Sequence, residues 1–164
     1  MAGHANVLVV ASLTATSKDL LAALRERAAR SPISVYLLMP AQSPGFSGRE
    51  ALKPQLDAAL ATWREAGLDA DGEVGDVDPI TAVHEVWDPG RFDEAIVSTL
   101  PGSSSRWLEF DFPHRVARIT GVSVMHVVAM DLRPEPAHGP PPPREHAALG
   151  PLSVLSWGGR AQQR

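Results

Sequence analysis

The sequence predicts a doubly wound α/β domain, a five-stranded parallel sheet in the order 3-2-1-4-5 with helices on both faces. Two observations support this fold class. Short apolar runs alternate along the chain with longer amphipathic segments, as successive βαβ units require. The apolar run Ala95-Ile-Val is followed at once by hydroxyl, Pro and Gly residues, which is typical of a buried parallel strand that ends at a ligand-binding loop.

The first half of the chain predicts two strands and two helices. Residues 6–11 and 33–39 are apolar and β-branched, as buried strands are. Ser17 suits the N-cap of the helix between them, which Ser31-Pro32 ends. That helix has an apolar stripe of Leu20, Leu21, Leu24 and Ala28, and we expect Arg25, Glu26, Arg27 and Arg30 in solvent.

The second predicted helix covers residues 50–66 and ends at Gly67, a glycine in the C′ position. Pro54 lies in this segment, which places it either in the first turn of a shorter helix or at a kink. Residues 68–74 alternate acidic and small or apolar side chains, as an edge strand does.

Asp78 and Pro79 suit the start of the third helix, which packs through Ile80, Val83 and Trp87. After the strand at residues 95–97, a fourth helix is predicted to start at Asp111, with an apolar side at Val116 and Ile119, and Gly121 closes it. Residues 122–129 form the last strand.

Two hydroxyl-rich loops follow the first and fourth strands, at residues 12–17 and 98–105. In this strand order the chain reverses direction between those strands, and ligands of open α/β sheets bind at that switch point. An alternative interpretation is a plain turn, because Ser, Pro and Gly favour turns. The predicted ligand-binding residues are Ser12, Thr14, Ser98, Thr99, Gly102, Ser103, Ser104, Ser105 and Arg106.

Composition excludes several classes of protein. The net charge of −4 argues against general nucleic-acid binding, which needs clustered Lys and Arg. The longest apolar runs are far shorter than a bilayer span, and residues 1–6 lack the pattern of a signal peptide, so we expect a cytoplasmic protein without a membrane partner. The chain has no Cys, which rules out thiolate catalysis and cysteine-bound metals.

Catalytic candidates are few. His114 lies near Asp111 and is a candidate acid–base group, although a surface histidine beside a capping aspartate has the same pattern. Ser103 lies in Pro-Gly-Ser-Ser-Ser, which is part of a nucleophile elbow. We expect His126 to be a bonded core or interface side chain, and no spacing predicts a metal site.

Several segments resemble the universal stress protein family. Gly75-Asp-Val-Asp-Pro-Ile-Thr-Ala is similar to the family's Gly-Asp turn, and Phe92-Asp-Glu-Ala-Ile-Val-Ser to its fourth strand. Arg115 to Val127 resembles its last helix and strand. The segments Ser98-Thr-Leu-Pro, Ser105-Arg-Trp-Leu and Phe112-Pro-His-Arg resemble an actinobacterial-type branch of the family. The resemblance covers residues 6–129.

The resemblance implies an adenine nucleotide such as ATP as cofactor, but the family's ATP motif is degenerate here. ATP-binding members have an Asp after strand one and Gly-x2-Gly-x9-Gly-Ser/Thr after strand four. This chain has Ala11-Ser-Leu-Thr at the first place, and Gly102 is the glycine left at the second. Phe110 and Phe112 stand where the closing Gly-Ser belongs, and we expect them to obstruct phosphate.

Three segments are expected along the chain: a stress-protein-like domain at residues 1–130, a Pro-rich linker at 131–149 and a tail at 150–164 that docks on a sheet edge. The uncharged last strand, Val122 to Ala129, predicts a homodimer. Pro140 to Pro143 is a candidate ligand for a polyproline-binding partner. The predicted function is a regulatory or scaffold module that binds a nucleotide or small anion; the alternatives are a nucleotide hydrolase or transferase, and a structural dimer without ligand.

Overall fold

A computed structural model describes residues 3–101 and 111–132 of the chain. One parallel sheet organises them, in the strand order β3-β2-β1-β4-β5. The predicted strand order and fold class are therefore confirmed. The strands are β1 (Ala5–Val10), β2 (Ile33–Pro40), β3 (Asp69–Gly75), β4 (Glu94–Thr99) and β5 (Val124–Val128).

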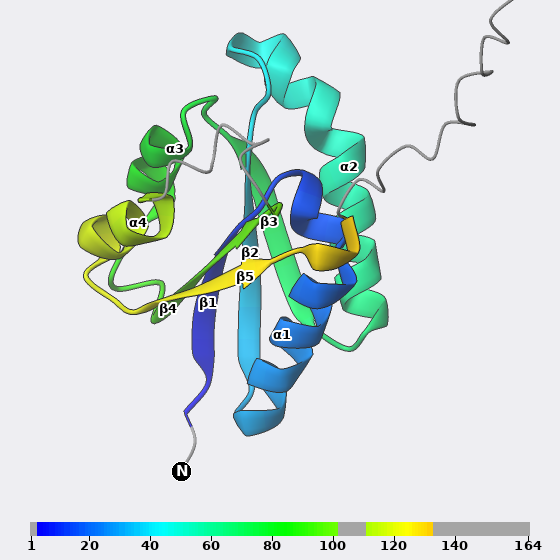
Figure 1. Ribbon diagram of the computed structural model, residues 1–164, viewed down its shortest axis with the longest axis vertical. Helices are drawn as coiled ribbons and strands as arrows, with labels where there is room; N and C mark the ends of the chain where they lie inside the picture. The colour runs from blue at the N-terminus through cyan, green and yellow to red at the C-terminus, as the bar shows by residue number, and fades with distance from the viewer. Residues whose placement is uncertain (1–2, 102–110, 133–164) are drawn as a thin grey trace, which may run out of the picture. The chain divides into compact units, whose positions relative to one another are not determined.

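Helices cover both faces of this sheet (Figure 1). The helices α1 and α2 pack on one face and α3 and α4 on the other, because alternate residues of each central strand point to opposite faces. Short 3₁₀ turns, η1 and η2, follow β1 and β5. The helical bounds are η1 (Leu13–Thr16), α1 (Lys18–Arg30), α2 (Gly45–Glu65), α3 (Pro79–Val86), α4 (Phe112–Thr120) and η2 (Met130–Leu132).

The helix ends confirm several local predictions. The Ser17 side chain accepts a hydrogen bond from the Leu20 amide at 3.0 Å, and the Asp78 side chain accepts one from the Ile80 amide. Gly67 and Gly121 follow α2 and α4 with φ of 86° and 70°, a left-handed conformation that favours glycine. These residues fix where the helices begin and end, and so where the loops leave the sheet.

Three predictions about the elements are wrong in detail. The helix α2 begins at Gly45 rather than near residue 50, and it continues through Pro54, so the proline lies well inside the helix. The ladder of β5 begins at Val124, two residues later than predicted. The strand β4 continues through Ser98 and Thr99, which were predicted to lie in the loop after it. The predicted start of α4 at Asp111 is confirmed, although the Asp111 side chain makes no capping hydrogen bond.

Arg27 is not a solvent-exposed residue, contrary to expectation. Its side chain is 12% exposed and forms a two-pronged ion pair with Glu94 at the start of β4. The paired guanidinium lowers the pKa of the Glu94 carboxyl, and the pair raises the pKa of Arg27. The pair therefore connects α1 to the amino end of β4.

Candidate functional site

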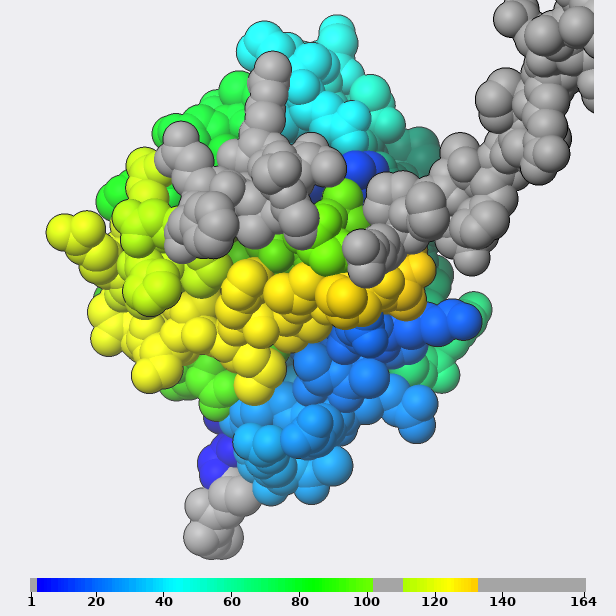
Figure 2. Space-filling model, in the orientation of Figure 1, coloured from blue at the N-terminus to red at the C-terminus, as the bar shows by residue number. Residues whose placement is uncertain are grey.

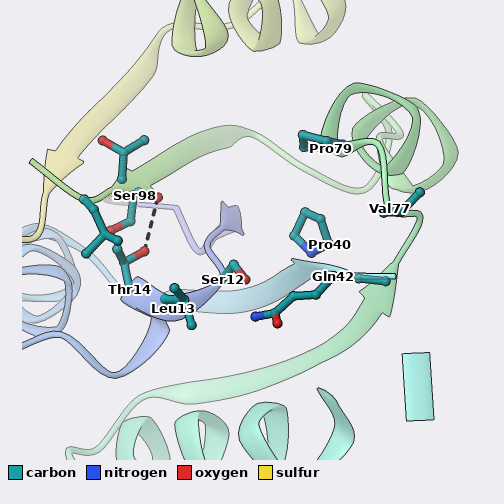
Figure 3. A pocket seen from close by; sticks show the side chains of 11 residues that line it. Ser12, Leu13, Thr14, Pro40, Gln42, Val77, Pro79 and Ser98 are labelled. Atoms are coloured by element: carbon teal, nitrogen blue, oxygen red, sulfur yellow. Dashed lines mark hydrogen bonds between the residues drawn. The ribbon is translucent and has the colours of Figure 1, made fainter. Parts of the chain in front are cut away.

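A pocket of about 420 Å³ opens at the carboxyl ends of the central strands (Figure 3). The loops after β1, β2, β3 and β4 all contribute to it, which is the position that a doubly wound sheet offers to a ligand. Its described lining residues are Ser12, Leu13, Thr14, Pro40, Ala41, Gln42, Val77, Pro79, Ser98, Thr99 and Leu100.

Hydrogen bonds hold η1 in place beside β4. The Thr14 hydroxyl donates to the Ser98 carbonyl at 3.2 Å, which joins the loop after β1 to the end of β4. From the other side, the indole N–H of the buried Trp63 donates to the Ala15 carbonyl at 3.1 Å. The η1 wall of the pocket is therefore attached both to the sheet and to α2.

The Ser98 hydroxyl is the unusual group of the site. Ser98 is only 2% exposed, and its Oγ has no hydrogen-bond partner within the described part of the chain. Burying a hydroxyl without a partner costs about 1–3 kcal/mol, so such groups are rare and call for an explanation. Because Ser98 lines the pocket, a ligand atom is in a position to satisfy it.

Thr99, the next residue along β4, points to the opposite face and is already bonded. Its Oγ1 lies 2.7 Å from Nε2 of His126 on β5. Burial lowers the pKa of His126, which keeps the imidazole neutral at physiological pH. His126 is thus hydrogen-bonded as expected, but it is an exposed residue of β5 and not a core side chain.

The loops after β2 and β3 supply a wall that the sequence analysis missed. Pro40, Gln42, Val77 and Pro79 line this side, and the Ala41 amide donates to the Asp76 carbonyl at 3.2 Å. These residues carry no local signal of a site. The strand order is the signal that could have found them, because the carboxyl ends of all five strands meet at one edge of the sheet.

Two carboxylates lie at the start of α1. The Asp131 carboxylate of η2 accepts a hydrogen bond from the Lys18 amide at 2.8 Å, and this bond holds the pKa of Asp131 below its usual range. In return, the Asp19 carboxylate accepts from the Met130 and Asp131 amides at 2.7 and 3.1 Å. Two acidic side chains thus join η2 to the first turn of α1.

The predicted site residues divide into three groups. Ser12, Thr14, Ser98 and Thr99 meet in the pocket. The second group, Gly102, Ser103, Ser104, Ser105 and Arg106, lies outside the described residues, as does Phe110. The third group is away from the pocket: His114 is exposed on α4, and Phe112 is 4% exposed in the core beneath α3 and α4. Phe112 is therefore a core residue and not one of the described residues that line the pocket.

The described ranges contain neither a cluster of metal-ligating side chains nor a membrane-spanning helix. Residues 3–101 and 111–132 contain no group of three His, Cys, Asp or Glu side chains suited to a metal ion. No helix in these ranges combines the length and apolar character needed to cross a bilayer.

The chain therefore forms a doubly wound α/β domain with a pocket at its switch point. Comparison with solved structures shows that the fold is that of the universal stress proteins. A universal stress protein in complex with cAMP aligns with a TM-score of 0.53 and 19% identity, over 77% of this chain and 98% of that one.

Two structures from Archaeoglobus fulgidus show the same likeness. The universal stress protein of that organism aligns with a TM-score of 0.54 and 15% identity, over 75% of this chain and 93% of that chain. Its complex with dAMP aligns with a TM-score of 0.53 and 15% identity, over 77% and 99% of the two chains. No protein-family model matches the sequence, and no curated protein matches it.

Proposed function

We propose that this protein is a universal-stress-protein-like regulatory module that binds a small molecule with an adenine nucleoside part in the pocket at the switch point. One observation carries the proposal: the buried, unpartnered hydroxyl of Ser98 lines a pocket at the edge where this fold binds ligands. The complexes of similar folds with cAMP and dAMP support the choice of ligand class.

The proposal is tested by calorimetric titration and thermal shift with ATP, AMP and cyclic AMP. Binding is expected, and Ser98→Val should weaken it because the larger side chain occupies the pocket and removes the hydroxyl. Tyr36→Phe, a change near the amino ends of the strands, is the matched control and should leave affinity unchanged. The absence of heat and of thermal shift at about 1 mM of each ligand would contradict the proposal and leave a scaffold without ligand.

A second candidate function is self-association through β5, and exposed apolar side chains favour it. Met125, Val128 and Met130 are 39%, 37% and 54% exposed. Figure 2 shows β5 and η2, yellow to orange, running across the surface. Within the described ranges β5 pairs with β4 alone, so its outer edge is available to a second copy. Met125→Lys should lower the sedimentation coefficient of a dimer, and a native chain that stays monomeric at high micromolar concentration would exclude this interface.

The tail raises a related prediction. Its residues lie outside the described part of the chain, and the linker, docking and polyproline predictions stay predictions. A chain that ends at Leu132 should dimerise more than the full chain if the tail covers β5 in the same molecule, and less if the tail reaches into a partner. Equal association of the two chains would show that the tail does not take part.

The hydrolase or transferase alternative lacks support from the described residues. His114, its candidate base, does not line the pocket. Phosphate release from ATP that is unaffected by His114→Ala and Ser103→Ala would remove those two residues from any such activity.

A further inference from the structure

We infer, building on the proposed function, that Gln42 selects the base of the ligand: its side-chain amide pairs with the exocyclic amine of adenine and with a ring nitrogen beside that amine. A purine without the amine should therefore bind more weakly. Three features of the described residues carry this inference: the fixed position of Gln42 on the pocket wall, the two functions of its amide, and the apolar side chains beside it.

The loop after β2 holds Gln42 at the pocket from a fixed point. Its neighbour Ala41 is 6% exposed, and the Ala41 amide donates to the carbonyls of Gly75 and Asp76 at 3.4 and 3.2 Å. The backbone beside Gln42 is therefore attached to the end of β3. From there Figure 3 shows the Gln42 side chain reaching toward Ser12. The amide thus stands in the pocket on a supported backbone.

The Gln42 amide differs chemically from the other polar groups of the wall. The remaining polar side chains among the described lining residues are the hydroxyls of Ser12, Thr14, Ser98 and Thr99. A hydroxyl donates and accepts through one oxygen, whereas an amide donates through its nitrogen and accepts through a separate oxygen in the same plane. Gln42 can therefore form two parallel hydrogen bonds to the edge of a flat ring, and its side chain makes none to another described residue.

Apolar side chains lie on both sides of Gln42. Leu13 of η1 and Val77 of the loop after β3 line the pocket and are 52% and 36% exposed, and Figure 3 shows them on opposite sides of the Gln42 side chain. Covering this surface with a ring is favourable because it removes apolar atoms from water. A purine held through its faces leaves its edge free for the amide. Apolar walls with a few placed polar groups are the usual arrangement of small-molecule pockets.

The edge of adenine matches an amide. Its exocyclic amine donates a hydrogen bond, and the ring nitrogens on either side of the amine accept one. Glutamine pairs with such an edge by accepting from the amine and donating to the ring nitrogen, as it does when proteins read adenine in DNA. A purine without the amine leaves the amide oxygen of Gln42 without a partner. Gln42 is thus a specificity-determining residue for the base.

Calorimetric titration of the full chain with adenosine and with purine riboside, which lacks the amine and is otherwise the same molecule, tests the inference. Adenosine is expected to bind about fivefold more tightly, the effect of one hydrogen bond. Gln42→Leu, a change of similar size, should abolish this preference, whereas Gln42→Glu keeps an acceptor for the amine and should retain it. Gln55→Leu, on α2 and outside the described lining, is the matched control and should keep the native preference.

The other outcomes have distinct meanings. A native chain that binds both compounds equally, or a Gln42→Leu variant that keeps the native preference, would overturn the inference and leave the proposed function intact. A Gln42→Glu variant that loses the preference as fully as Gln42→Leu would also overturn it, because the amide oxygen would then not be the contact. Thermal unfolding of each variant checks that the fold is unchanged, as expected for an exposed residue. The absence of binding by adenosine, AMP and ATP would overturn the proposed function, and this inference with it.

Discussion

Two cavities of equal volume, about 420 Å³ each, differ in the state of their polar groups. The pocket at the carboxyl ends of the strands has neutral walls and contains the unpartnered Ser98 hydroxyl. The second cavity lies near the amino ends of β1, β2 and β3. We call it the amino-end cleft; its lining residues are Asn6, Ser34, Val35, Tyr36, Asp69, Asp71, Gly90, Arg91 and Phe92.

Polar side chains of the amino-end cleft already have partners. The Ser34 hydroxyl donates to Asp69, the Tyr36 hydroxyl donates to Glu73 at 2.6 Å, and the Arg91 guanidinium lies 4.3 Å from the centre of the Tyr36 ring. A ligand there would have to displace contacts that already exist, whereas a ligand at Ser98 would supply one that is absent. The state of the polar groups, rather than cavity volume, therefore favours the pocket at Ser98 as the candidate binding site.

The largest effect on stability is expected from removing Trp63, which supports the η1 wall of the pocket. Trp63 is fully buried, so Trp63→Ala should lower the free energy of unfolding by about 3–5 kcal/mol, measured by denaturant titration. Trp63→Phe keeps most of the apolar burial but leaves the Ala15 carbonyl without its donor, which should cost about 1–3 kcal/mol and weaken ligand binding. A loss below about 1 kcal/mol for Trp63→Ala would show that the indole is not an essential part of this core.

A smaller effect on stability is expected from ionisation of Tyr36 in the amino-end cleft. Burial, with help from the hydrogen bond to Glu73, raises the pKa of Tyr36 to about 12. Because the pKa of an unfolded tyrosine is about 10, the Tyr36 contribution to stability is complete below about pH 10 and is lost as the pH rises toward 12. Tyr36 is the single tyrosine of the chain, so its ultraviolet absorption reports this titration directly.

The same side chain offers a stability test. Tyr36→Phe should cost about 0.5–1.5 kcal/mol, since it removes one hydrogen bond to a charged acceptor at the surface. Ligand affinity should not change. An ionisation midpoint near the ordinary tyrosine value would contradict the account of this cleft as a set of satisfied groups.

The smallest effect on stability is expected from protonation of His126. Its pKa is lowered by burial, so the unfolded chain binds a proton more readily than the folded one. The contribution of His126 to the free energy of unfolding is therefore complete above about pH 6.5 and is lost as the pH drops through the lowered pKa. His126→Gln keeps a hydrogen-bonding side chain and should flatten this part of the pH profile, measured by thermal unfolding between pH 5 and 8. An identical profile for the variant would assign the acid sensitivity to other groups.

Local signals in the sequence predicted the fold well. Ser17, Asp78, Gly67 and Gly121 mark helix ends through bonds or backbone conformations that span only a few residues, and apolar runs mark the strands. The start of α2 had no such signal, because its first turn lacks an apolar stripe. The Arg27–Glu94 pair was equally hidden, since it joins residues far apart in the chain.

The site was predictable to the extent that topology alone determines it. Ser12 and Thr14 follow β1, and Ser98 and Thr99 end β4. These two strands meet at the switch point, so the convergence of the four residues follows from the strand order. The wall formed by Gln42 has no distinctive residue pattern. Whether a hydroxyl is bonded depends on its neighbours in space, so no pattern in the sequence separates Ser98 from other serines.

The most direct test of the central claim compares two buried serines in the free protein. Ser17 and Ser98 are 1% and 2% exposed, but the Ser17 hydroxyl caps α1 whereas the Ser98 hydroxyl has no described partner. Ser17→Ala should lower the free energy of unfolding by about 0.5–2 kcal/mol.

Ser98→Ala removes an unsatisfied group and breaks no bond, so in the same denaturant titration the free protein should be as stable as the native chain or more stable, by up to about 1 kcal/mol. Adenosine affinity should fall in the same variant, by up to about tenfold, because the hydroxyl meets its partner when the ligand binds. A Ser98→Ala variant that loses as much stability as Ser17→Ala, with unchanged adenosine affinity, would contradict the claim that this hydroxyl is reserved for a ligand.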